Sequence, residues 1–101
     1  MFTYTDDQLK GWKKKHGDDS VFEVVAGDKK AVLHKPTRQD LSFATAGSSA
    51  GQDNVKFCEI LLKQCWIDGD MEIQTNDDYF FGVISVIQEM ASSKEASIKK
   101  L

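Results

Sequence analysis

Two cysteines and two histidines are the side chains of this sequence best suited to bind a soft metal ion. Cys58 and Cys65 stand seven residues apart, and His16 and His34 occur in other parts of the chain. Structural zinc sites usually show close ligand pairs, such as two cysteines separated by two residues, and the sequence has no such pair. The spacing therefore predicts no metal site and no cofactor, with both cysteines serving as small core residues.

A cysteine paired with a histidine could also make a nucleophile. However, Cys58 and Cys65 both fall on the predicted buried side of one helix, and no pattern pairs either of them with a histidine. Seven helical residues separate two Cα atoms by about 10 Å, whereas a disulfide requires less than about 7 Å. The sequence predicts two reduced cysteines, as is usual in the cytosol, and no catalytic residue.

An acidic turn at residues 68–70 opens like a calcium-binding EF-hand loop. Such a loop requires glycine at its sixth position and glutamate at its twelfth. This chain has Ile73 and Tyr79 there, so a solvated turn is expected instead.

A basic run at residues 13–15, next to Trp12, is the feature closest to a nucleic-acid-binding patch. It lies at the end of a predicted helix, where cations are favourable in any case, and two aspartates follow at once. The chain carries a net charge of -3, and its isoelectric point is near 5.3. These features predict that nucleic acid is not a partner.

Aromatic residues make up 10% of the chain, and protein interfaces favour them as much as cores do. Phe80 and Phe81 are neighbours on a predicted helix, so their side chains point about 100° apart. We expect Phe81 and Trp12 to be the candidate partner-binding residues. A second internal contact that covers them is the alternative.

The chain has the size and composition of one folded domain, residues 1–101. It has a mass of 11.3 kDa, with 41% hydrophobic and 29% charged residues. Folding at this size buries roughly 65% of the surface of the open chain. No apolar run approaches the roughly 20 residues of a membrane helix, and the first 15 residues lack a secretory signal. A cytoplasmic protein without membrane contact is expected.

The N-terminal region, residues 5–35, predicts a helix followed by a short antiparallel β-hairpin. Thr5 and Gln8 have the spacing of a capping box at the start of the helix. The helix has a weak apolar face and should pack on the surface. Residues 21–26 and 31–33 are rich in β-branched or apolar side chains on either side of a glycine turn, as in a hairpin.

The region 37–101 is predicted to be mainly helical. Thr37, with Asp40 three residues later, opens a helix after Pro36 has ended the strand. A loop of small residues follows at 46–51, and a second helix spans 52–67. Its predicted buried stripe comprises Val55, Cys58, Leu62, Cys65 and Trp66.

A third helix should begin at Thr75, with Asp78 as its capping partner, and run to Met90. Residues 71–73 are expected to form an extended connector. Residues 91–101 are compatible with a helix, in which Ile98 and Leu101 would continue an apolar edge. The fold class is α+β, a hairpin with about four helices, and the main core lies between residues 55–66 and 79–90.

Three segments of the C-terminal two-thirds resemble the small tail assembly chaperones of long-tailed bacteriophages and prophages. Residues 31–42 combine a strand end, a Lys35-Pro36-x-Arg38 junction and a helix start. Residues 59–70 are an apolar helix that ends in Cys65-Trp66 and an acidic turn at Gly69. The third segment is the long terminal helix, closing at residues 94–96. The resemblance covers about 70 residues, and the soft loop at 47–51 departs from it.

The resemblance implies a protein-binding function without enzymatic activity in the host bacterial cytoplasm. Such chaperones bind the tape measure protein, keep its long apolar helices soluble and help to recruit tail tube subunits. Some members are also made in a longer frameshifted form, to which this chain would be the short counterpart. Self-association is left open. A small structural subunit of a tail or connector is the alternative, and a small metal-dependent or cysteine hydrolase is the least favoured hypothesis.

Overall fold

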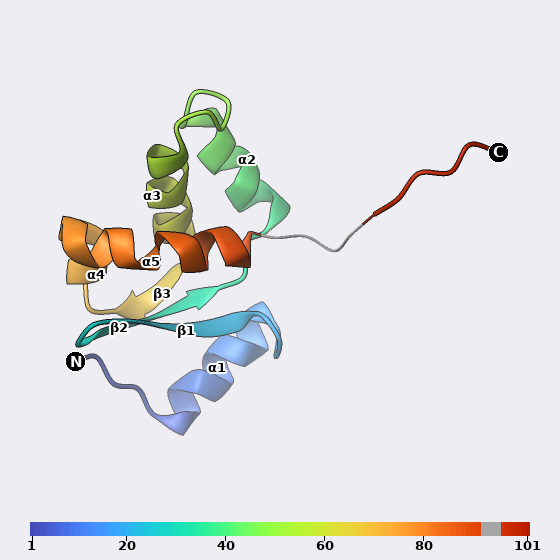
Figure 1. The fold of residues 1–101 in the computed structure, drawn as a ribbon. Helices are drawn as coiled ribbons and strands as arrows, with labels where there is room; N and C mark the ends of the chain where they lie inside the picture. Colours follow the sequence, from blue (N-terminus) through green and yellow to red (C-terminus); the bar gives the residue numbers. More distant parts are fainter. Residues whose placement is uncertain (92–95) are drawn as a thin grey trace.

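The computed structural model describes residues 1–91 and 96–101, and it has the predicted α+β class (Figure 1). The elements in chain order are helix α1 (Asp6–His16), strands β1 (Val21–Ala26) and β2 (Lys29–His34), helices α2 (Arg38–Ala46) and α3 (Asn54–Cys65), strand β3 (Trp66–Gly69), and helices α4 (Glu72–Thr75) and α5 (Asp77–Met90). Within these residues, we find no helix with both the length and the apolar character needed to cross a membrane.

The N-terminal helix and the hairpin are confirmed. The Thr5 hydroxyl accepts the Gln8 backbone N–H at 3.2 Å, and the Gln8 side chain accepts the Thr5 N–H at 2.8 Å, which completes the capping box. Helix α1 buries none of its residues, in agreement with its weak apolar face. Strands β1 and β2 pair antiparallel from Val21 opposite His34 to Ala26 opposite Lys29.

The predicted end of the second helix is wrong, because residues 66–69 form a third strand. Helix α3 ends at Cys65, and β3 pairs antiparallel with β2, with Trp66 opposite Leu33 and Gly69 opposite Ala31. Trp66 and Ile67 suit a helix or a strand equally in periodicity, so the free edge of β2 decides their conformation. Val55 was also misplaced, since 47% of its surface is exposed.

The expected extended connector is instead the short helix α4. The backbone N–H of Ile73 donates to the Asp70 carbonyl at 3.1 Å, which begins the turn, and Ile73 is completely buried. The capping residue of α5 is Asn76 rather than Thr75, because the Asn76 side chain accepts the Asp78 N–H at 3.0 Å. The capping box predicted for α2, with Thr37, is confirmed.

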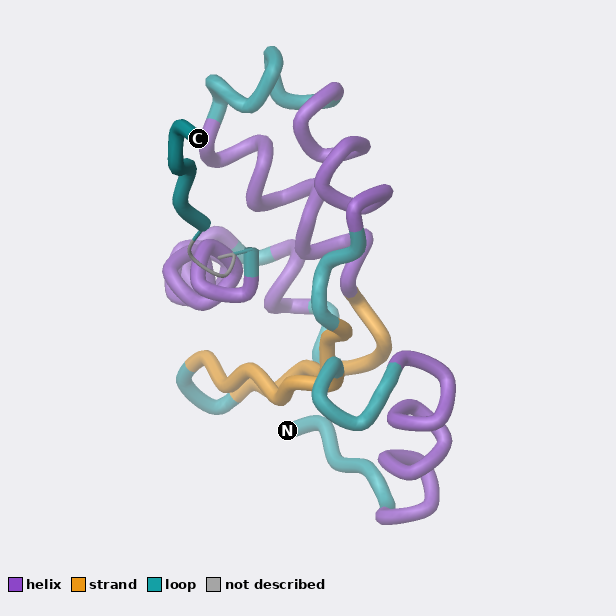
Figure 2. Tube along the Cα trace, turned by 90° about the vertical axis from the view of Figure 1, so that its right-hand side faces the viewer, coloured by secondary structure: helices purple, strands orange, loops and turns teal. Residues whose placement is uncertain are grey.

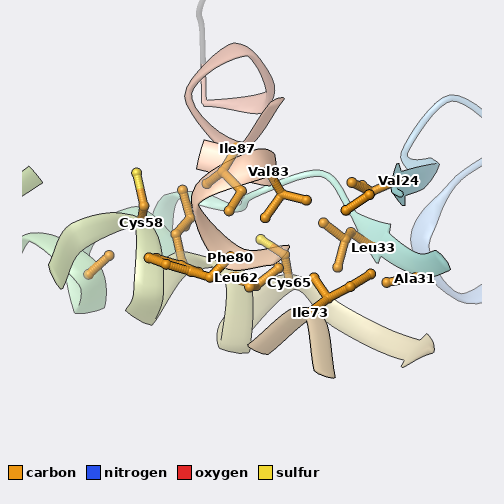
Figure 3. Packing of buried hydrophobic residues seen from close by; sticks show 13 residues of the cluster. Val24, Ala31, Leu33, Cys58, Leu62, Cys65, Ile73, Phe80, Val83 and Ile87 are labelled. Carbon is orange, nitrogen blue, oxygen red and sulfur yellow. The ribbon is translucent and has the colours of Figure 1, made fainter. Parts of the chain in front are cut away.

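Helices pack against both faces of the sheet (Figures 1 and 2). Helices α3, α4 and α5 lie on one face, and α1 with the N-terminal arm lies on the other. Side chains alternate between faces along a strand, so Ala31 and Leu33 join the main core whereas Val32 is buried on the α1 side. Figure 3 shows Leu33 among residues of α3, α4 and α5, so the predicted core between α3 and α5 has the sheet as a third wall.

The chain after α5 does not continue the predicted apolar edge. Helix α5 ends at Met90, residues 96–101 are not helical, and the Ile98 and Leu101 side chains are fully exposed. The predicted helix end at residues 94–96 falls largely outside the described residues.

The acidic turn after β3 is an anchor for the N-terminal arm rather than only a solvated loop. One carboxylate oxygen of Asp70, Oδ2, accepts the backbone N–H groups of Phe2 and Lys30, both at 2.9 Å. The N–H of Phe2 and then that of Lys30 lower the pKa of Asp70, because both donate to its charged form. A single carboxylate thus joins residues that lie far apart in the sequence.

We expect Asp70→Asn to lower the melting temperature at neutral pH. The folded pKa of Asp70 lies below its unfolded value, so this stabilisation is complete above the unfolded pKa and is lost as the pH falls through the folded pKa. The difference between wild type and variant should therefore shrink below about pH 4. Thermal unfolding across this pH range tests the prediction. Asp68→Asn is the control, since Asp68 accepts the N–H of its neighbour Gly69 and does not hold the N-terminal arm. A difference that is constant with pH would contradict this origin.

Candidate functional site

Trp12, one of the two predicted partner-binding residues, is half-buried in an aromatic row. Its ring centroid lies 5.4 Å from that of Tyr4, which lies 5.9 Å from that of Phe2. The Tyr4 hydroxyl donates to the Glu23 carboxylate at 2.8 Å and so joins the row to β1. Trp12 therefore holds the N-terminal arm and α1 together, which is the internal contact that the sequence left as an alternative.

Phe81, the other predicted residue, is exposed over 57% of its surface, whereas its neighbour Phe80 is buried. The two side chains differ in burial, as expected for adjacent helical positions, although their ring centroids lie only 5.9 Å apart. Helices α1 and α5 lie on opposite faces of the sheet (Figure 1), so Trp12 and Phe81 do not share one surface. Phe43 is similarly exposed on α2, at 59%, and a shallow groove runs beside it. Phe43 is not among the residues predicted to bind a partner, because its helical position is also compatible with the apolar face of α2.

The residues that carry the family resemblance belong to two segments that are neighbours in the fold. Lys35, Pro36 and Arg38 form the junction between β2 and α2, and Trp66 and Gly69 are the ends of β3. Because β3 pairs with β2, the two resembling segments, 31–42 and 59–70, lie side by side. Each segment therefore supplies part of the same structural unit.

This pairing also creates a cluster that sequence spacing did not reveal. A ring nitrogen of His34, a carboxylate oxygen of Asp40 and the Sγ atom of Cys65 all lie within 4.8 Å of one another. The three side chains come from the end of β2, the first turn of α2 and the last residue of α3. No local spacing could indicate the cluster, because it depends on the β2–β3 pairing that the sequence did not predict.

Both ring nitrogens of His34 face oxygen atoms. Nδ1 is 3.0 Å from the carbonyl oxygen of Lys35 and 3.9 Å from Oδ2 of Asp40, and Nε2 is 3.0 Å from the carbonyl oxygen of Gln64. A carbonyl can only accept, and a neutral imidazole carries one N–H. One nitrogen of a neutral His34 would therefore direct its lone pair at an oxygen atom.

His16 lies against His34. The rings of His16 and His34 stack with their centroids 4.7 Å apart and their planes 13° from parallel. Burial lowers the pKa of His16, and the positive charges of His34 and Lys15 lower it further, so the neutral form of His16 is favoured. A hollow beside the stacked rings is lined by His16, Ser20, His34, Lys35, Pro36, Thr37 and Asp40.

Cys65 lacks the properties of a nucleophile. It is only 1% exposed, and burial, followed by the Asp40 carboxylate, raises the pKa of its thiol to about 12. The thiolate is the reactive form, and at neutral pH almost none would be present. Cys58 is also buried with a raised pKa, and both cysteines are free, as predicted.

No family model matches the sequence, and neither the curated proteins nor the solved structures include a significant match. The candidate sites described above are the exposed Phe81 side chain on α5 and the cluster of His34, Asp40 and Cys65.

Proposed function

We propose that this protein is a non-enzymatic tail assembly chaperone or adaptor of a phage or prophage, and that it binds the tape measure protein during tail morphogenesis. The observation that supports a binding function is the exposure of Phe81 on α5, while Phe80 beside it is buried. The family resemblance supplies the partner. Recruitment of tail tube subunits, self-association and a host cytoplasmic location belong to the same proposal.

The placement of Phe81 suits contact with an apolar helix. Phe80, Val83 and Ile87 anchor α5 in the core, so the opposite side of a fixed helix carries Phe81. An aromatic side chain on a rigid element loses little conformational freedom on binding, and such residues often dominate interface energies. A helical segment of the partner would pack across it in the manner of helix-in-groove recognition.

We expect Phe81→Ala to weaken binding of a tape measure fragment by about tenfold or more, which is typical of an aromatic anchor. The fold should be retained, because most of the side chain is already exposed. Co-expression and co-purification with several fragments would identify the bound segment, and titration calorimetry would give the change in affinity. Circular dichroism would verify folding.

Phe43→Ala is the matched control, since Phe43 has the same side chain at the same exposure on another helix. Its affinity should stay near that of wild type. Equal binding by wild type and Phe81→Ala would contradict the role of α5, and failure of the folded wild-type chain to bind any fragment would contradict the proposed function. Mass spectrometry of purified phage particles distinguishes a chaperone from a structural subunit of the tail or connector. A structural subunit would remain in the particles, whereas a chaperone would not.

A further inference from the structure

We propose that His34, Asp40 and Cys65 form a binding site for a divalent transition-metal ion of the zinc class. The site is independent of the tape measure proposal. Imidazole, carboxylate and thiolate are the three side-chain groups that bind zinc in proteins, and here one of each converges from three separate elements.

The distances suit such an ion after a small adjustment. With metal–ligand bonds of about 2.0 to 2.3 Å, the atoms of a tetrahedral site lie about 3.3 to 3.6 Å apart. The three candidate atoms here lie within 4.8 Å of one another. Side-chain rotation that draws them in by roughly 1 Å would complete the coordination.

The contacts of His34 identify which nitrogen would bind. Nε2 lies 3.0 Å from the Gln64 carbonyl oxygen, to which it can donate a hydrogen bond, and Nδ1 is the nitrogen that faces Asp40. Metal-bound histidines usually donate their other ring N–H to a carbonyl or carboxylate in this way. A cation at Nδ1 would also remove the unfavourable approach of a nitrogen lone pair to the Lys35 and Asp40 oxygens.

Asp40 and Cys65 are the other two proposed ligands. Oδ2 of Asp40 accepts the Thr37 N–H at 2.9 Å, which fixes the carboxylate with this oxygen 3.9 Å from Nδ1 of His34. Cys65 would bind as the thiolate, and its proton would pass to water. The stacked ring of His16 lies over the plane of His34, so His16 orients that ring rather than binding the same ion.

A fourth ligand can come from the hollow beside His34 and Asp40. Three protein ligands with a water molecule are a common zinc environment. The ion would join β2, α2 and α3, and thus the two segments that resemble the tail assembly chaperones. Its principal effect would be to stabilise this junction.

Titration of the chelator-treated full chain with Co²⁺ tests the proposal. The wild type should take up one ion per chain and develop the absorption of thiolate-to-cobalt charge transfer, which requires a cysteine ligand. Cys65→Ser should lose this absorption and bind at least about tenfold more weakly. Cys58→Ser is the matched control, since Cys58 is equally buried on the same helix but lies outside the cluster, and it should behave as wild type.

Two further measurements test the proposal even if Cys65→Ser fails to fold. His34→Gln and Asp40→Asn keep the thiol and should each weaken Co²⁺ binding, with circular dichroism reporting the fold. Zn²⁺ should raise the melting temperature of wild type and Cys58→Ser but not of His34→Gln. A folded wild type without the charge-transfer absorption, or undiminished binding by the His34 and Asp40 variants, would overturn the proposal.

Discussion

Gly69→Ala is expected to destabilise the protein by about 3 kcal/mol or more. Gly69 has a φ angle of +153°, which side chains other than glycine rarely adopt. A Cβ atom at this position would lie 2.6 Å from the Ala31 Cα, 2.7 Å from the Ala31 Cβ and 2.8 Å from the Lys30 carbonyl oxygen. Backbone strain and overpacking each typically cost about 1 to 3 kcal/mol, and here neither strand can move away without breaking the pairing.

Such a loss is a large part of the roughly 5 to 15 kcal/mol by which domains are stable. It would act on the β2–β3 pair, which holds residues 31–42 against residues 59–70. Chemical denaturation would give the free energy of unfolding, and the Co²⁺ titration should weaken in the same variant because the ligands come from both segments.

The same glycine-to-alanine substitution at Gly82 is expected to stabilise the protein, in contrast to Gly69→Ala. Gly82 lies within α5, and a Cβ atom there would meet nothing within 4 Å. Alanine is favoured over glycine inside a helix by about 0.5 to 1 kcal/mol, so this variant should be more stable than wild type. An equal loss of stability in both variants would show that close contact with β2 is not the cause.

The parts of the fold that could be predicted are those determined by neighbours in the sequence. Capping by Thr5 and Thr37 requires only side chains three residues away, and both boxes form as expected. The hairpin likewise follows from two β-rich runs around one turn. Among the candidate residues, the burial of Phe80 and the exposure of Phe81 follow from helical geometry alone.

The parts that could not be predicted depend on contacts between distant residues. The local pattern predicts a helix at Trp66, but this residue lies in strand β3 because β2 offers a free edge. The cluster of His34, Asp40 and Cys65 follows from that same pairing, so missing the strand also meant missing the site. Trp12 lies on the predicted helix, but it packs against Tyr4 of the N-terminal arm, a contact that helical periodicity does not indicate.

Ile73→Ala is expected to cost about 2 to 5 kcal/mol, the range for removing a large aliphatic side chain from a core. Ile73 is completely buried although its helix, α4, has only four residues. Figure 3 shows its side chain near Leu33 and Cys65. Since so short a helix is not stable by itself, the burial of Ile73 is what fixes α4 against β2 and α5.

Met71→Ala is the control two residues earlier, where 54% of the side chain is exposed, and it should change the stability by no more than about 0.5 kcal/mol. Melting temperatures and denaturation midpoints of the three proteins test the difference. Helix α4 directly precedes α5, so a loosened α4 should also weaken partner binding through Phe81 without any change to that side chain. A cost below about 1 kcal/mol for Ile73→Ala would instead favour the extended connector that local sequence predicts, because a connector would leave Ile73 outside the core.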